Sequence, residues 1–96
     1  MQTDTFTVDA VGDPDPITVI ADCRKVTIRQ QGGLGATAYT IYSADDSTGA
    51  GNGVNYPGGF DKVFQRLRGQ GDFRDGEVIG YIEIASGKAT FSMECE

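Results

Sequence analysis

The chain has 96 residues, a formal net charge of −6 and no histidine. Its length allows one small domain with a single core, and its negative charge argues against a surface devoted to nucleic acid or to anionic membranes. The lack of histidine excludes imidazole-based catalysis and histidine metal ligands, and no apolar run approaches the roughly 18 residues of a membrane span.

The composition predicts an all-β fold. Fourteen glycines are spread through the chain as expected for many turns, and the apolar runs consist mainly of the β-forming residues Val, Ile, Thr, Tyr and Phe. The first residues have neither a basic region nor an apolar core, so we expect no secretory signal and synthesis in a cytoplasm.

Residues 3–11 alternate between apolar and polar side chains, with Phe6 and Val8 on the apolar side. This pattern predicts a strand or an extended arm that adds a strand to a neighbouring subunit. Residues 12–16 contain two prolines and a glycine, which are expected to end the strand. Residues 1–16 are therefore expected to form an N-terminal arm or edge strand, followed by a single β domain over residues 17–96.

Short strands are expected at residues 17–21, 26–29 and 37–43, with a loop at 30–35. In the second of these strands, Val26 and Ile28 are expected to face the core and Thr27 the solvent. In the third, Tyr39 and Ile41 share one face.

A long glycine-rich segment occupies residues 44–59. Loops of this length are uncommon in compact domains and are usually functional or mobile. Val54 and Tyr56 are compatible with a brief strand inside it, and the remainder is suited to projecting outward.

Several carboxylates resemble metal ligands without forming a known pattern. Asp45, Asp46 and Asn52 offer the oxygen atoms that Ca²⁺ prefers, but their spacing is not that of an EF-hand loop. Asp13 and Asp15 alternate with prolines, which is ordinary turn chemistry. We interpret both groups as solvated turn residues and expect neither a metal nor a cofactor.

Residues 60–68 fit two periodicities. Phe60, Val63, Phe64 and Leu67 have helical spacing, but the same segment also alternates as an edge strand would. We favour the strand because the surrounding segments are predicted to be β.

Half of the basic residues lie close to Phe64 and Phe73, in a short span. They suggest either a groove for single-stranded nucleic acid or a solvated or partner-facing edge, which we favour because three nearby aspartates dilute the charge. Acidic residues near the N-terminus complement them, so copies could meet head to tail around a ring. The candidate partner and oligomer contacts are Phe6, Val8, Lys62, Arg66, Arg68 and Arg74.

Residues 77–96 show the clearest strand pattern and predict a β-hairpin with its turn at Ser86 and Gly87. One face of the second arm carries Ala89, Phe91, Met93 and Cys95. A symmetric turn would pair Ile82 with Phe91 and would place Gly80 beside Met93, leaving room for the longer side chain.

Cys23 and Cys95 are too few for a disulfide scaffold. Both occupy apolar-facing strand positions, which favours buried free thiols. The alternative is a disulfide that joins the last strand to an early one.

Two segments resemble small structural proteins of tailed bacteriophage virions. They are IADCRKVTIR at residues 20–29 and FRDGEVIGYI at residues 73–82, the latter followed by Ser86-Gly87 and Thr90-Phe91. The chain looks like a capsid decoration (cement) protein or another minor head protein. The resemblance implies a small β-sandwich or jelly-roll domain that binds the lattice of the major capsid protein in the virion, often as a trimer. It carries no functional residues with it.

The sequence therefore indicates a non-enzymatic virion protein that decorates or stabilises a capsid. The main alternative is a tail-associated or carbohydrate-binding module that uses Tyr42, Tyr56 and the 44–59 segment. An enzyme that uses Asp75 and Glu77 is a third interpretation. Exposed aromatic rings around a concave face would favour the binding module.

Overall fold

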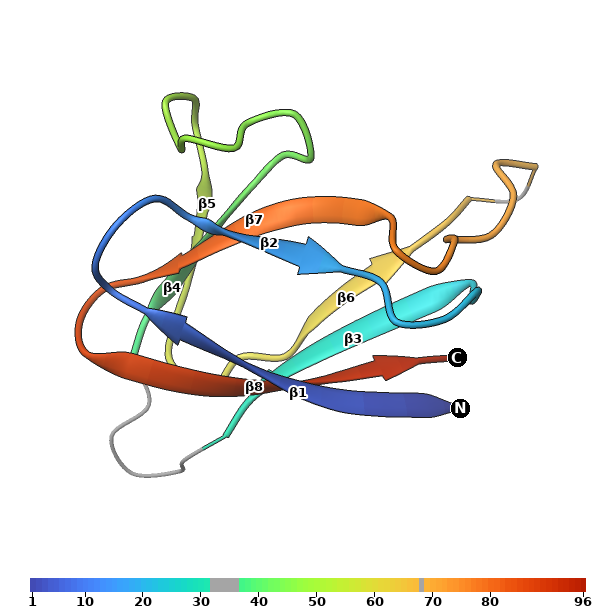
Figure 1. Ribbon diagram of the computed structural model, residues 1–96, viewed down its shortest axis with the longest axis horizontal. Helices are drawn as coiled ribbons and strands as arrows, with labels where there is room; N and C mark the ends of the chain where they lie inside the picture. Colours follow the sequence, from blue (N-terminus) through green and yellow to red (C-terminus); the bar gives the residue numbers. More distant parts are fainter. Residues whose placement is uncertain (32–36, 68) are drawn as a thin grey trace.

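A computed structural model of the chain describes residues 1–31, 37–67 and 69–96. These residues form β-strands joined by turns and contain no helix, which confirms the predicted all-β fold (Figure 1). The strands are β1 (Gln2–Asp9), β2 (Asp15–Thr18), β3 (Lys25–Gln30), β4 (Tyr39–Tyr42), β5 (Val54–Tyr56), β6 (Lys62–Gln65), β7 (Val78–Ile84) and β8 (Lys88–Cys95).

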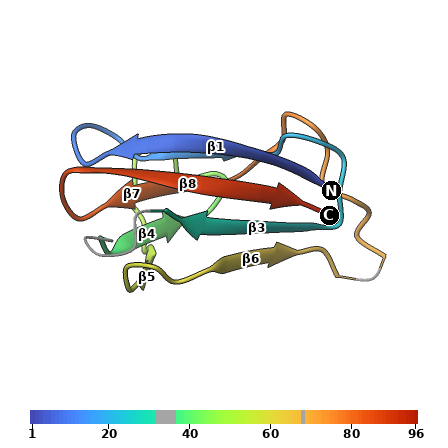
Figure 2. The same ribbon diagram turned by 90° about the horizontal axis from the view of Figure 1, so that it is seen from below.

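The strands form two four-stranded antiparallel sheets, ordered β1-β8-β3-β6 and β2-β7-β4-β5. In Figure 2 the first sheet lies in front, with β7, β4 and β5 behind it. The pairs β1–β8, β2–β7, β3–β6 and β4–β5 are nested, as in one long antiparallel ribbon that turns between β4 and β5. The pairs β3–β8 and β4–β7 close the folded ribbon into two sheets. This strand order is that of a jelly roll, so the predicted β-sandwich of jelly-roll type is confirmed.

The predicted terminal hairpin is wrong, because its two strands do not pair with each other. The two predicted strands and the intervening turn exist, but β7 and β8 belong to opposite sheets. Ile82 pairs with Ile41 and Asp15, whereas Phe91 pairs with Phe6 and Gln30. The alternating pattern shows which face of each strand is buried but does not show whether two buried faces lie side by side or opposite each other across a core.

Gly80 therefore does not make room for Met93. A Cβ atom on Gly80 would lie 3.0 Å from the carbonyl oxygen of Tyr42 and 3.7 Å from a side-chain carbon of Ile17. Gly80 lies at the centre of its sheet, where β4 and β2 approach β7 from both sides. Met93 lies in the opposite sheet and pairs with Asp4 and Ile28.

The proline-rich segment also differs from expectation. Asp15 and Pro16 lie within β2, where Pro16 pairs with Tyr81, so the strand expected at 17–21 begins earlier and ends at Thr18. β2 is an edge strand, where the N–H that proline lacks is not required by a second neighbour. Residues 2–9 likewise form an edge strand, because β1 pairs with β8 from Gln2 to Asp9.

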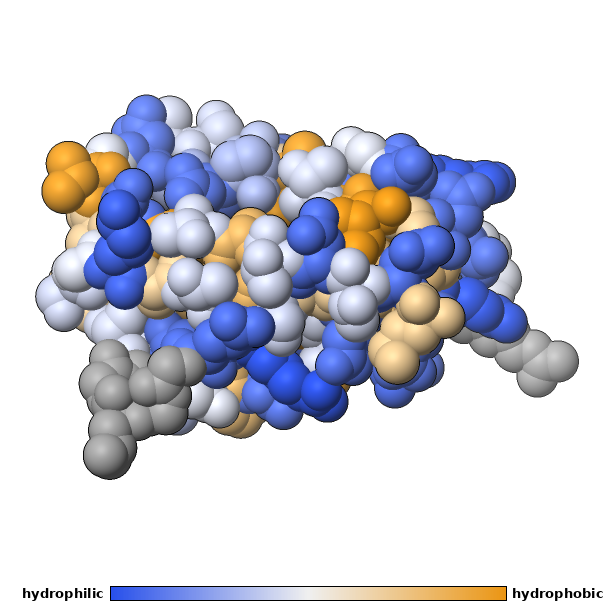
Figure 3. All heavy atoms as spheres, turned by 60° about the horizontal axis from the view of Figure 1, so that its bottom comes forward, coloured by the Kyte–Doolittle hydropathy of each residue, from blue (hydrophilic) through white to orange (hydrophobic). Residues whose placement is uncertain are grey.

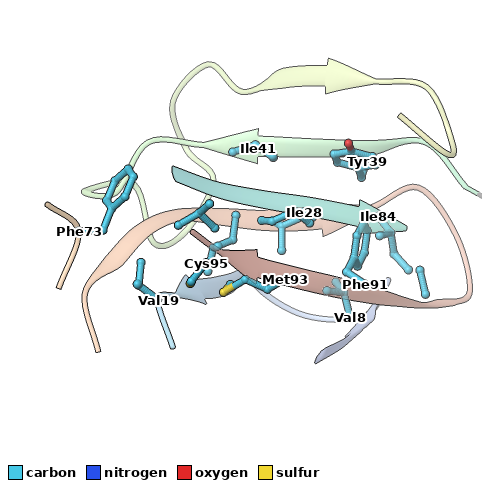
Figure 4. Packing of buried hydrophobic residues seen from close by; sticks show 14 of the residues in the cluster. Val8, Val19, Ile28, Tyr39, Ile41, Phe73, Ile84, Phe91, Met93 and Cys95 are labelled. Atoms are coloured by element: carbon cyan, nitrogen blue, oxygen red, sulfur yellow. The ribbon is translucent and has the colours of Figure 1, made fainter. Parts of the chain in front are cut away.

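The core between the sheets contains the predicted inward residues Val26, Ile28, Tyr39 and Ile41. The last three are labelled in Figure 4. Thr27 was expected to face solvent and does lie on the outer face, yet it is buried, because Glu94 and Val63 flank it in the neighbouring strands. Phe73 joins the core through a loop that forms a bridge with Cys23.

The remaining strand predictions are confirmed in part. Val54 and Tyr56 do belong to a brief strand, β5, so the long connection is confined to residues 43–53. The ambiguous 60–68 segment contains a strand, β6, and Arg68 lies outside the described residues. The loop predicted at 30–35 also falls largely outside them; Gln30 itself ends β3.

Aromatic rings form a continuous series through the core. Phe6 stacks on Phe91, which meets Tyr39 edge to face, and Tyr39 stacks on Tyr56, with ring centroids 5.4 Å apart at each step. Phe60 stacks on Tyr56 at the end of the series, at 5.1 Å. Such pairs contribute about 0.5–1.5 kcal/mol each beyond area burial.

The buried phenol of Tyr39 predicts a loss of stability in alkali. Burial, followed by the charges of Tyr56 and Asp61, raises the pKa of Tyr39 to about 12. At pH values below 10.0, the ordinary pKa of this phenol, the stabilisation that neutral Tyr39 gives to the folded state is fully present. As the pH rises from there towards 12, only the unfolded chain ionises freely, so folding loses up to about 3 kcal/mol from this group.

The measurement is urea unfolding at pH 8 and pH 11 for the wild type and Tyr39→Phe. We expect the variant to lose less stability than the wild type over this interval, although it also lacks the hydrogen bond from Tyr39 Oη to the Phe60 carbonyl. Equal losses in the two proteins would contradict this assignment.

Candidate interaction surfaces

The sandwich has two open sides. Strands β1 and β2 are the edges of the two sheets on one side, and β6 and β5 are the edges on the other. We call these the β1/β2 edge and the β5/β6 edge. Side chains from both sheets meet at each edge. At the β1/β2 edge, residues of both strands line a pocket. At the β5/β6 edge, Lys62 of β6 lies over the ring of Tyr56 of β5.

At the β1/β2 edge, alternate backbone groups of β1 point away from its sheet. The Thr5 N–H donates to the carboxylate of Asp4 (2.8 Å), not to β8, whereas the Ala10 N–H just beyond the strand donates to the Gly87 carbonyl (2.9 Å). Because these directions alternate along a strand, the N–H groups of Thr3 and Thr7 also face outward. Of this row, the Thr5 N–H is bonded to the neighbouring side chain of Asp4, and no other strand of the sheet covers it, so a further strand can add here.

The β5/β6 edge has the same property. The Arg66 N–H donates to the Arg24 carbonyl beside β3 (3.2 Å), and the next N–H, that of Leu67, donates to the side chain of Gln70 (2.8 Å). By the same alternation, the N–H groups of Val63 and Gln65 face outward. Both edges of the β1-β8-β3-β6 sheet therefore present unpaired backbone groups.

The pocket at the β1/β2 edge has a volume of about 220 Å³. Its apolar lining comes from Phe6, Pro16, Ile20 and Met93, and Asp4 contributes a carboxylate. Of the two candidate contacts on β1, Phe6 is thus accessible at this pocket, while Val8 is 1% exposed and belongs to the core.

The predicted basic cluster is divided between separate partners. Arg66 forms an ion pair with Glu77 and lies over the ring of Phe73, 4.4 Å from its centroid. Arg74 pairs with Asp22 at 3.4 Å. The structure thus joins these two arginines to acids of the same chain and does not gather them into one groove with Phe64.

Lys62 differs from the two arginines. Its ammonium group lies 5.3 Å from the ring centroid of Phe64 and 5.4 Å from that of Tyr56. Within residues 1–31, 37–67 and 69–96, it forms no ion pair. Of the candidate basic residues whose structure is described, Lys62 alone forms no ion pair.

The aspartates of the long connection serve the turn itself. The carboxylate of Asp46 accepts the N–H groups of Ala50 (3.1 Å) and Gly51 (2.9 Å). The hydroxyl of Ser43 donates to Asp45 and lowers the pKa of that carboxyl. Across the described part of the chain, no group of three or more acidic or cysteine side chains is placed to hold a metal ion.

The aromatic rings proposed for carbohydrate binding already pack against other residues of the chain. The Tyr42 hydroxyl donates to Glu83, and Gly49 and Gly53 lie so close to the Tyr42 ring that a Cβ atom on either would contact it within 3.2 Å. Tyr56 lies between two other rings of the aromatic series. The 43–53 connection therefore packs on Tyr42 and leaves no flat aromatic platform there.

The carboxylates considered for catalysis also have structural roles. Glu77 binds the Arg66 guanidinium and accepts the Arg74 N–H at 3.0 Å. Asp75 lies in the same turn, where its N–H donates to Asp22 at 2.8 Å. Together they fix the chain before β7.

Both cysteines are buried free thiols. Burial, and next the neighbouring thiol of Cys95, raise the pKa of Cys23 to about 12. The thiolate of Cys23 is thus suppressed at neutral pH, which makes this thiol a poor nucleophile.

No protein-family model, curated protein or solved structure matches the chain.

Proposed function

We propose that the chain is a structural protein of a tailed-bacteriophage virion that decorates or stabilises the capsid by binding the lattice of the major capsid protein. Its place is then the virion, after synthesis in the host cytoplasm. The observation that supports this function is the jelly-roll strand order, which is the fold that the sequence resemblance implies. Jelly rolls also occur in lectins and cupins, so the proposal depends on fold and resemblance together.

The surface agrees with a protein that binds a larger assembly and remains in solvent. In the view of Figure 3, polar residues cover most of the face, and exposed hydrophobic residues form small separate patches. Arg29 of β3 also forms ion pairs with Asp61 of the loop before β6 (3.0 Å) and with Glu94 of β8 (2.6 Å).

The test is sedimentation with empty heads built from the major capsid protein encoded in the same genome. We expect the protein to pellet with the heads and to saturate at a fixed number of copies per capsomer. The control is the protein sedimented alone, and a second control uses heads saturated with unlabelled protein. Failure to pellet at an excess of protein would overturn the proposal.

A glycan-array screen separates the proposed function from the carbohydrate-binding alternative. Because the rings of Tyr42 and Tyr56 are occupied, we expect no glycan to bind. A specific glycan whose binding is lost in Tyr42→Ala, with the fold retained, would favour the alternative.

A further inference from the structure

We propose that the β5/β6 edge of one copy binds the β1/β2 edge of a second copy, so that the chain self-associates head to tail through a continuous β-sheet. This inference goes beyond the capsid assignment and does not depend on it. It concerns the contact between copies, and its test requires no capsid protein.

Strand direction permits this pairing. All neighbours in the β1-β8-β3-β6 sheet are antiparallel, so β1 and β6 run in opposite directions. A rotation about an axis parallel to the strands leaves their directions unchanged. A second copy related by such a rotation therefore places its β1 antiparallel to β6 of the first, and the outward N–H and C=O rows of both strands can pair.

The side chains of the two edges are complementary. In a continuous sheet, residues on the inner face of β6 lie beside residues on the inner face of β1. Phe64 and Lys62 share the inner face with Val26 and Ile28.

On β1, the inner face at the pocket carries Phe6 and Asp4. In the antiparallel register that pairs Val63 with Thr5, the ring of Phe64 lies opposite Asp4 at the apolar pocket. Lys62 then lies opposite Phe6 and diagonal to Asp4, within reach of a long side chain. Asp4 forms no ion pair within the described part of the chain, so both charges are available.

Exposed apolar side chains favour the same partner. Phe60 and Val63 are each 45% exposed and Val54 is 56% exposed, and all three lie at or beside the β5/β6 edge. An edge strand with unpaired backbone groups and exposed apolar residues is a site for pairing with another chain. Because the contact joins two different surfaces, it forms a ring if the rotation closes and a filament if it does not.

Charge reversal at each edge tests the proposal. The wild type is measured by size-exclusion chromatography with light scattering at concentrations up to about 1 mM. We expect a defined oligomer, and association weakened by about tenfold or more in Asp4→Lys and in Lys62→Asp, because each substitution places like charges together. The Asp4→Lys/Lys62→Asp double variant is expected to recover association to within about threefold of the wild type.

Two comparisons complete the test. Asp75→Lys makes the same charge change in the turn before β7, outside both edges, and is expected to associate as the wild type does. Lys62→Gln removes the charge without reversing it, in case Lys62→Asp does not fold, as judged by circular dichroism. A monomeric wild type, or an oligomer that neither edge substitution weakens, would overturn the proposal.

Discussion

Replacing Phe91 with alanine is expected to remove about 3–5 kcal/mol from the free energy of unfolding. Phe91 is fully buried, stacks on Phe6 and meets the edge of Tyr39. The substitution therefore leaves a cavity at the centre of the core and separates the aromatic rings of β1 and β4. Because small domains have only about 5–15 kcal/mol of total stability, this loss is a large fraction of the free energy of unfolding.

The measurement is thermal unfolding followed by circular dichroism, in which we expect the midpoint to fall by about 12 °C or more. Phe60→Ala is the matched control, since Phe60 stacks on one ring only and is 45% exposed. Its midpoint is expected to fall by much less. If the two variants unfolded at the same temperature, the assignment of Phe91 as the centre of the core would be wrong.

Replacing Gly80 with valine is expected to destabilise the protein by about 1–3 kcal/mol or more, through overpacking. Its Cβ position already lies 3.0 Å from the Tyr42 carbonyl oxygen, which belongs to the backbone and cannot move without displacing β4. Valine adds two further methyl groups in this space. The effect should appear as a lower urea midpoint with an unchanged slope.

The expected loss of stability in Gly80→Val is opposite to the change that strand propensity predicts. Valine is a better strand former than glycine, so strand propensity alone predicts a gain in stability. Gly80→Ala adds only the Cβ atom and is expected to lie between the wild type and Gly80→Val. A valine variant as stable as the wild type would show that β4 does not approach β7 as closely as the structure indicates.

The sequence was sufficient for the choice of β-structure and for most inward-facing residues. Alternation places Val26, Ile28, Tyr39 and Ile41 on buried faces, and the structure agrees. Alternation identifies these inward-facing residues for a geometric reason. Successive side chains of a strand point to opposite faces, so the pattern of a single segment states which face avoids water, whatever its neighbours are.

The pairing of the strands could not be predicted from the sequence in the same way. A hairpin and a crossing between sheets bury the same side chains of β7 and β8, and the turn at Ser86 and Gly87 suits both. The jelly roll separates the two strands because β7 pairs with β2 and β4, and β8 with β1 and β3. Each neighbour lies far away in the sequence, so no local signal identifies it.

The candidate contact residues could also be predicted only in part from the sequence. The sequence proposed Phe6 and Lys62 as candidate partner contacts, and the structure places both at open edges. It also grouped them with Val8, which is buried, and with Arg66, whose charge is already balanced by Glu77. The pocket at β1 and β2 was not foreseen, because its lining combines residues from three separate segments of the chain.

By itself, the sequence determined that this chain is an all-β domain and which face of most of its strands is buried. The tertiary structure alone decided which strands are neighbours, which charges are balanced within the chain, and where the two sheets leave open edges. Local patterns depend on the geometry of one strand, whereas neighbours, ion pairs and pockets depend on distances between segments that meet only after folding.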